Sequence, residues 1–152
     1  MGQKESSAKT LAAFREATME LDNLYSRFPK SCGLSEAEYW SLLLIYEGIV
    51  TQSRISEQLF LSRQTLNSAF KQLQKKGFDL SGCPIKTICG CKRAFLTEAG
   101  KAFVEENVLR MHRVEERAWQ HMSQEDQAVL TALIRKFSSC IRKELDDSNT
   151  KG

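Results

Sequence analysis

Residues 51–77, TQSRISEQLFLSRQTLNSAFKQLQKKG, constrain the fold more than any other stretch of this chain. After Ser62, apolar residues recur at the i, i+3, i+4, i+7 spacing of one helix face. Ser62 suits the N-cap of that helix, and a shorter helix precedes it across the apolar corner Leu59-Phe60-Leu61. Two short helices joined by a tight turn predict a helix-turn-helix, whose second helix enters a DNA groove. The apolar face of that second helix consists of Leu66, Ala69, Phe70 and Leu73.

The opposite face of the second helix is polar and basic. At about 100° per residue, it carries Gln64, Ser68, Lys71 and Lys75, and no carboxylate. Residues 58–97 contain seven basic residues and one acidic residue, a net charge of +6, whereas the whole chain carries +3. Phosphate contacts dominate affinity for DNA. This concentration of positive charge therefore favours DNA binding over the alternative, a solvated lysine-rich surface helix.

Helical patterns flank this segment on both sides. Residues 8–30 form an amphipathic helix that Pro29 is expected to end, because proline disfavours helical geometry in the residue before it. Ser35 and Glu38 form a capping box for a strongly apolar helix that ends near Gly48. Between 78 and 97 the helical periodicity is lost, and two β-compatible segments predict a hairpin wing with its tip at residues 89–91. Helices are predicted again over 98–121 and 124–146.

These elements define a mainly α fold with a small β-hairpin wing. We expect a winged helix-turn-helix domain over 34–97, a helical dimerisation region over 8–30 and 98–146, and flexible tails over 1–7 and 147–152. A winged helix of this size has its own core. The long amphipathic helices outside it are therefore expected to bury their apolar faces against a second copy. The alternative is a closed bundle within one chain.

The composition limits where and how such a chain works. The five cysteines are an odd number without regular disulfide spacing, which predicts reduced thiols and a cytoplasmic protein. The N-terminus lacks the apolar core of a secretion signal. No apolar run approaches the ~18 residues that cross a bilayer. There is also no phosphate-binding glycine loop, nucleophile elbow or His-Glu metal motif, so neither an enzyme nor a cofactor is expected.

Three of the cysteines, Cys83, Cys89 and Cys91, lie in one stretch of nine residues in the predicted wing. A structural zinc site needs four ligands, and no nearby histidine completes the set, so no metal is expected. Basic neighbours would favour the thiolate form of these cysteines. Two interpretations stay open: a redox switch in the wing, and ordinary reduced cysteines.

The order of the elements and three short motifs resemble the MarR family of transcriptional regulators over nearly the whole chain. The motifs are the segments 61–66 (LSRQTL), 75–78 (KKGF) and 96–101 (LTEAGK). The resemblance implies a homodimer whose recognition helices enter successive major grooves of a pseudo-palindromic operator in double-stranded DNA. It also implies wings that reach the minor groove or the backbone. The implied function is repression that a small-molecule or oxidant signal relieves.

Carried onto this chain, the resemblance supplies a set of DNA-binding residues. Wings of the family commonly have an Asp-x-Arg tip. The corresponding residues 85–91 contain neither residue type, so Lys92 and Arg93 are the candidates there. The whole DNA-binding set is Arg54, Ser62, Arg63, Gln64, Thr65, Asn67, Ser68, Lys71, Lys75, Lys86, Lys92 and Arg93.

The resemblance also places an effector pocket between the winged helix and the dimerisation helices. Tyr25, Tyr39, Trp40 and Tyr46 are its candidate lining residues, and the alternative is that these aromatic side chains fill the core. Two other functions stay open at this stage. One is a winged-helix module for protein interaction, and the other is a thiol or metal sensor with weak DNA binding.

Overall fold

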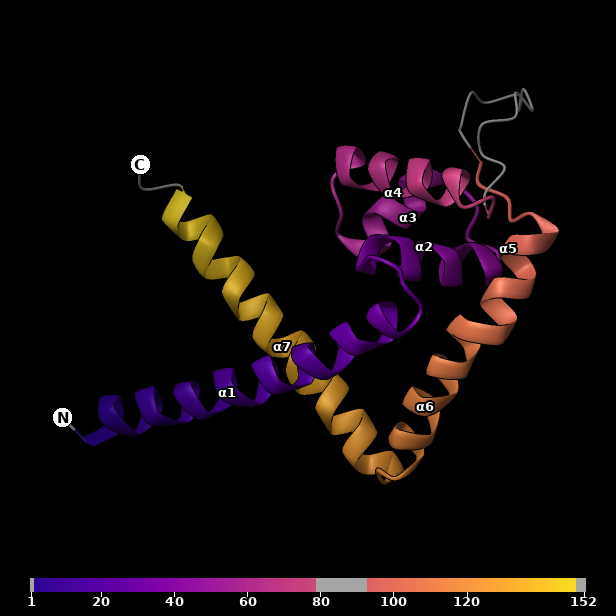
Figure 1. Ribbon diagram of the computed structural model, residues 1–152. Coiled ribbons are helices and arrows are strands. Elements are labelled where there is room, and N and C mark those ends of the chain that lie inside the picture. Colours follow the sequence, from indigo (N-terminus) through magenta and orange to yellow (C-terminus); the bar gives the residue numbers. More distant parts are fainter. Residues whose placement is uncertain (1, 79–92, 150–152) are drawn as a thin grey trace. The chain divides into compact units, whose positions relative to one another are not determined.

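The computed structural model describes residues 2–78 and 93–149, which form helices joined by short turns (Figure 1). The contacts divide the chain into two compact units, Met1–Met111 and His112–Gly152. The predicted, mainly helical fold class is confirmed. The elements are α1 (Gly2–Ser31), α2 (Glu36–Tyr46), α3 (Gln52–Leu59), α4 (Arg63–Lys75), α5 (Glu98–Phe103), the π-helical segment η1 (Val104–Val108), α6 (Leu109–Gln120) and α7 (Gln124–Asn149).

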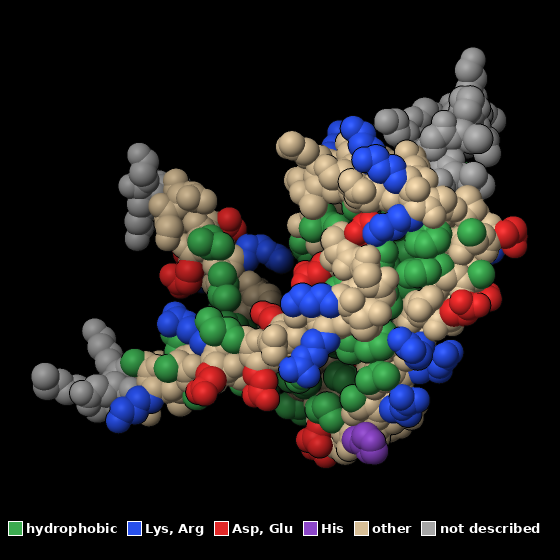
Figure 2. All heavy atoms as spheres, in the orientation of Figure 1, with side chains coloured by type: hydrophobic (Ala, Val, Ile, Leu, Met, Phe, Trp, Pro, Cys, Tyr) green, Lys and Arg blue, Asp and Glu red, His purple; other side chains and the backbone are tan. Residues whose placement is uncertain are grey.

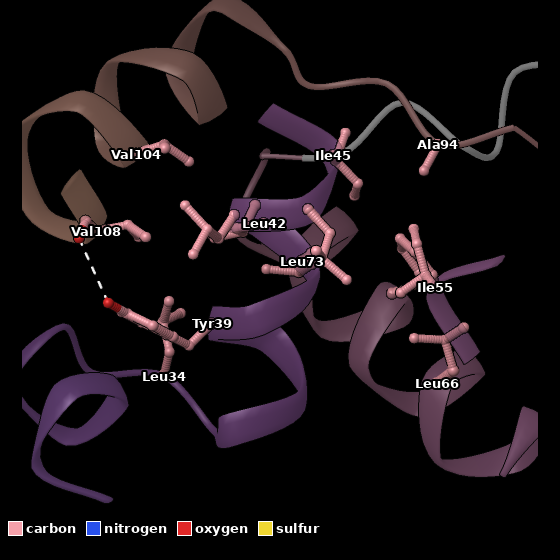
Figure 3. Close-up of a cluster of buried hydrophobic side chains, with 13 residues drawn as sticks. Leu34, Tyr39, Leu42, Ile45, Ile55, Leu66, Leu73, Ala94, Val104 and Val108 are labelled. Carbon is pink, nitrogen blue, oxygen red and sulfur yellow. Dashed lines mark hydrogen bonds between the residues drawn. The ribbon is translucent and has the colours of Figure 1, made fainter. Parts of the chain in front are cut away.

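Helix α2 is the centre of the first unit, as its apolar sequence predicts. It contacts α1, α3, α4 and η1. Tyr39 and Leu42 are buried beside Val104 and Val108 of η1, and Leu73 of α4 closes the same cluster (Figure 3). Burying each such side chain stabilises the fold by about 1.5–3 kcal/mol. Burial against its neighbours therefore holds α2 in place far more than helix propensity does.

The predicted capping residues are confirmed. The backbone N–H of Glu38 donates to Ser35 Oγ over 3.3 Å, and the N–H of Ser35 donates to Glu38 Oε2 over 2.8 Å. Gly48 (φ +94°) follows α2 and Gly77 (φ +77°) follows α4. Both glycines adopt the left-handed conformation that commonly ends a helix. Helix α7 begins where expected, with Ser123 Oγ accepting the N–H of Asp126.

Three predicted boundaries are wrong. Helix α1 continues through Pro29 to Ser31, because the proline is buried and its carbonyl accepts the N–H groups of Cys32 and Leu34. Tertiary packing thus outweighs the single backbone hydrogen bond that proline removes. Residues 2–7, predicted as a tail, belong to α1. Helix α7 extends to Asn149, beyond the expected end at residue 146.

The predicted wing lies almost entirely outside the described residues, but the residues on either side of it are fixed. Arg93 pairs with Thr51 in an antiparallel bridge, and the N–H of Ala94 donates to the carbonyl of Val50 over 2.7 Å. Thr97 Oγ1 donates to the carbonyl of Gly77 over 2.6 Å. Thr97 therefore lies beside the C-terminal end of α4, in the same unit as α3 and α4. The proposed use of the flanking helices in dimerisation concerns a second chain and stays a prediction.

A half-buried ion pair joins the start of α2 to the end of α4. Lys76 Nζ lies 2.7 Å from Glu38 Oε1, and the Glu38 side chain is only 6% exposed, against 34% for Lys76. Burial disfavours the charged carboxylate. Hydrogen bonds from Lys76 and Ser35 outweigh that cost and hold the pKa of Glu38 below its ordinary value. Lys76 therefore stabilises the orientation of α4 on α2.

We expect Lys76→Met to lower the free energy of unfolding by about 2 kcal/mol at neutral pH, because it leaves the Glu38 carboxylate without its cation. This is less than fully buried pairs lose, since Lys76 is one-third exposed. Denaturant titration measures the loss. Lys75→Met, which changes an exposed neighbour, should shift the free energy by no more than about 0.5 kcal/mol.

The same pair predicts a pH dependence. The pKa of Glu38 is lower in the folded chain than in the unfolded one, so its contribution is complete above the ordinary glutamate pKa of about 4.3. It is lost as the pH falls through the folded value. The difference between wild type and Lys76→Met should therefore shrink near about pH 3. An equal difference in the free energy of unfolding at neutral pH and near about pH 3 would contradict this account of the ion pair.

Candidate nucleic-acid interface

Helices α3 and α4 form the predicted helix-turn-helix, and the turn between them is held by two serines. Ser62 caps α4, with its Oγ accepting the N–H of Thr65 over 3.1 Å. Ser56 Oγ donates to the carbonyl of Leu61 over 2.7 Å, and the N–H of Leu61 donates back to the carbonyl of Ser56. The start of α4 is therefore fixed relative to α3. The predicted apolar face is confirmed, since Leu66, Ala69, Phe70 and Leu73 are all buried.

The opposite face of α4 is exposed along its whole length. Because the apolar face is buried, the polar and basic side chains on the other side of the helix point to solvent. Figure 2 shows basic side chains gathered over α4. The α4 residues of the predicted DNA-binding set are all exposed, namely Ser62, Arg63, Gln64, Thr65, Asn67, Ser68, Lys71 and Lys75.

The remaining members of the predicted DNA-binding set lie outside α4. Arg54 is exposed on α3. Arg93 is exposed beside Thr51, its antiparallel bridge partner. Lys86 and Lys92 lie outside the described residues, and so do the cysteines of the predicted wing, Cys83, Cys89 and Cys91. The structure therefore brings the helix-turn-helix residues together, and the roles expected of the wing stay predictions.

The electrostatics of α4 suit an anionic partner. The helix contains Arg63, Lys71 and Lys75 and no carboxylate, and no acid occupies its first turn. The first backbone N–H groups and the helix dipole add positive potential at Ser62. Lys76 contributes less than its sequence position suggests, because Glu38 is its salt-bridge partner. That pairing was missed in the sequence because the two residues are 38 positions apart.

One residue of the turn exposes a large apolar side chain. Phe60 is the middle residue of the apolar corner Leu59-Phe60-Leu61, and its side chain is 91% exposed. Its backbone is left-handed (φ +53°, ψ +34°), the only positive φ among the described non-glycine residues. The flanking Leu59 and Leu61 are half-buried, and Leu59 packs against the core. A tight turn between two helices cannot direct three consecutive side chains to the same side.

The four aromatic residues of the predicted effector pocket lie in different surroundings. Tyr39 is buried, and its hydroxyl donates to the carbonyl of Val108 over 3.4 Å. Tyr46 is exposed and its hydroxyl donates to Glu105 Oε1 over 3.3 Å. Tyr25 and Trp40 line a common cleft, with ring centroids 6.2 Å apart.

That cleft lies between α1 and α2. It has a volume of about 420 Å³ and is lined by Asp22, Tyr25, Glu36 and Trp40. A second cleft of about 310 Å³ shares Glu36 and Trp40, and its other wall is formed by α3 and the turn. The residues of that wall are Gln58, Leu59 and Leu61, next to the N-cap of α4. Glu36 and Trp40 are therefore the residues that the two clefts have in common.

The geometry and the comparisons with known proteins agree on the class of fold. A helix-turn-helix packed on a core helix, followed by a return of the chain beside it, is the arrangement of a winged helix-turn-helix protein. By sequence, the chain matches no family model and no curated protein. By structure, it has the fold of the MarR family of transcriptional regulators, as the motifs imply.

Three solved structures illustrate this likeness. A MarR family regulator from Neisseria meningitidis has a TM-score of 0.77 at 16% identity, covering 91% of this chain and 98% of that one. MepR from Staphylococcus aureus, solved in complex with DNA, has a TM-score of 0.68 at 18% identity, covering 85% and 94%. The regulator MOSR from Mycobacterium tuberculosis, also solved with DNA, has a TM-score of 0.57 at 19% identity, covering 86% and 96%.

Other kinds of site are not evident in the described part of the chain. Among residues 2–78 and 93–149, no group of histidine, cysteine and acidic side chains is arranged to hold a metal ion. In the same residues, no helix has both the length and the hydropathy needed to cross a bilayer. The described cysteines, Cys32 and Cys140, are free thiols.

The cap at Ser62 predicts a measurable effect on stability. We expect Ser62→Ala to lower the free energy of unfolding by about 1 kcal/mol, because the N–H of Thr65 loses its acceptor. Ser68→Ala is the matched control, since Ser68 is exposed and its Oγ donates to the carbonyl of Gln64 in its own helix. The free energy of unfolding of Ser68→Ala should stay within about 0.5 kcal/mol of the wild-type value. Denaturant titration of both variants distinguishes a true cap from an incidental contact.

Proposed function

We propose that this chain is a DNA-binding transcriptional regulator of the MarR type. It acts in the cytoplasm as a homodimer on a pseudo-palindromic operator, and it represses until a small molecule or an oxidant relieves it. The observation that supports this most is the exposed face of α4, which has three basic residues, several amide and hydroxyl groups, and no carboxylate. MepR and MOSR, which share the fold, were both solved with DNA.

The side chains on this face divide into two roles. Arg63 and Gln64 lie in the first turn of α4, where a recognition helix meets the base edges. Their groups suit bidentate contacts, arginine with guanine and glutamine with adenine, and Ser68 follows on the same face. Ser62 and Thr65 at the N-terminus and Lys71 and Lys75 further along suit phosphates, which fix register but carry no sequence information.

The proposed dimer rests on apolar surface that a single chain leaves exposed. Helix α7 has no buried residue, and its apolar side chains recur on one face. Monomeric proteins rarely expose a continuous apolar surface of this kind, and a symmetric pair of chains would cover it. The exposed residues of this face are Leu130, Leu133, Ile134, Phe137, Ile141 and Leu145.

Relief by a small molecule is supported by the two clefts around Trp40. The cleft with Asp22 and Glu36 combines two carboxylates with two aromatic rings. This chemistry favours a flat organic cation over an anion. Since the second cleft includes Leu59 and Leu61, a ligand there would press on the turn that positions Ser62. Relief by an oxidant would act through Cys83, Cys89 and Cys91, and it rests on the sequence alone.

The main alternative is a winged-helix module that binds a protein. A protein-binding face has no need to exclude carboxylates, whereas a DNA-binding face does. A salt titration separates the two functions. DNA affinity should fall steeply between about 50 and 200 mM salt, with a slope set by the number of phosphate contacts. No enzymatic function is proposed, because solved structures that share the fold are MarR family proteins.

Substitutions on α4 test the proposed roles. We expect Arg63→Ala and Gln64→Ala each to cost about 1–3 kcal/mol of operator affinity and to relax the preference at one or two base pairs. Lys71→Ala should weaken binding to all duplexes about equally and reduce the salt slope by about one. Operator selection from random DNA, followed by titration with mismatched duplexes, measures both effects.

Arg142→Ala is a control that removes one positive charge from α7. It should change affinity much less than Lys71→Ala does. If Arg63→Ala and Gln64→Ala both bind the selected operator like wild type, the recognition helix has been assigned wrongly. If wild type selects no sequence and binds no duplex even at low salt, the proposed function is wrong.

The exposed face of α7 predicts the outcome of adding a charge to it. Ile134→Glu should shift the chain from dimer toward monomer at micromolar concentration, because burying an unpaired carboxylate in an apolar interface is unfavourable. Ser139→Glu is the matched control. Residue 139 lies about 180° around the helix from Leu130 and is exposed, so the dimer should persist. Sedimentation velocity measures both, and a wild-type monomer would contradict the proposed dimer.

A further inference from the structure

The turn of the helix-turn-helix exposes an aromatic side chain in an unfavourable backbone conformation. Phe60 is 91% exposed, the largest value among the exposed large hydrophobic residues of the described chain. It is also the residue there that adopts a left-handed conformation without being glycine. A Cβ atom disfavours this conformation, which glycine adopts freely. Glycine would therefore suit the turn better, and it would not leave a phenyl ring in water.

Within residues 2–78 and 93–149, nothing requires an aromatic ring at this position. The turn is held by its neighbours, through Ser56 Oγ and the backbone bonds of Leu61. Leu59 packs against the core, and Leu61 is half-buried. Strained residues with no role in packing occur preferentially at functional sites. The ring of Phe60 is thus an exposed apolar group on a rigidly held turn.

The position of the turn indicates what the ring meets. Phe60 precedes the N-cap Ser62 by two residues, so their Cα atoms are at most ~7 Å apart. In a helix-turn-helix the first residues of the recognition helix contact the base edges and the flanking phosphates. A side chain immediately before that helix therefore lies at the edge of the groove. The apolar groups available there are the deoxyribose and the C5-methyl of thymine.

We infer that Phe60 is a DNA-contacting residue that packs against apolar groups of the duplex at the edge of the major groove. This inference rests on the proposed DNA binding and extends it. The α4 face recognises DNA through hydrogen bonds and charge, whereas Phe60 adds an apolar contact from the turn. Binding removes the ring from water, and this offsets the unfavourable exposure in the free protein.

The central test compares Phe60→Gly with wild type on the selected operator. We expect affinity to fall about tenfold, because the buried ring area is lost. Thermal stability should stay equal or rise, since glycine relieves the left-handed strain. The slope of log affinity against log salt should not change, because no charge is removed. Weaker binding by an equally stable protein with an unchanged salt slope identifies an apolar contact.

Phe60→Leu is the matched variant, because it keeps an apolar side chain and the unfavourable backbone. We expect Phe60→Leu to bind the operator more tightly than Phe60→Gly does, and to lack the added stability that glycine gives. Operators in which each thymine in turn is replaced by uracil then distinguish the two apolar partners. If a thymine methyl is the contact, one replacement should weaken wild type about three- to fourfold and leave Phe60→Gly unaffected. If deoxyribose is the contact, every replacement affects both proteins equally.

The possible failures are distinguishable. If wild type binds its operator and Phe60→Gly binds it equally well, Phe60 does not touch DNA. The inference is then wrong while the proposed function stands, and the exposed ring becomes a surface for a protein partner. If affinity falls together with stability, the ring is structural and the inference is also wrong. If wild type binds no duplex, the inference fails together with the proposed function.

Discussion

The burial of one face of α4 against the core determines what the other face can do. Leu66, Phe70 and Leu73 are buried in the cluster around α2, and each contributes on the order of 1.5–3 kcal/mol. Rotating the helix about its axis would expose all three. The outward direction of Arg63 and Gln64 is therefore fixed by apolar packing rather than by any contact of their own. A polar surface that binds in a defined register needs this kind of support from beneath.

The ion pair between Glu38 and Lys76 adds a second constraint. It connects the first turn of α2 to the end of α4, while the cap at Ser62 fixes the beginning of α4. The helix is thus held at both ends as well as along its buried face. The pair also reduces the positive charge near the end of the helix. The free basic charge of α4 is concentrated on Arg63, Lys71 and Lys75.

Periodicity and capping in the sequence predicted most of the helix-turn-helix. The apolar spacing of α4, the N-cap Ser62 and the capping box at Ser35 are local patterns, so no tertiary information was needed to find them. Pro29 was misjudged because a local rule competes with burial that no local pattern reveals. The exposure of Phe60 could not be predicted from the sequence, because the direction of a side chain in a turn depends on backbone angles that hydrophobicity does not reveal. The partner of Lys76 is 38 residues away in sequence.

The two clefts suggest how the proposed regulation and DNA binding are connected. Leu59 and Leu61 are half-buried and line one cleft, and they flank Phe60 immediately before Ser62. A ligand can change operator affinity only if it binds one arrangement of this turn better than another. Leu61 is hydrogen-bonded to Ser56 and directly precedes Ser62, whose Oγ accepts the N–H of Thr65. Moving Leu61 would therefore displace the cap and the start of α4 together. Glu36 and Trp40 line both clefts, so a ligand beside Tyr25 would act on the turn through these two residues.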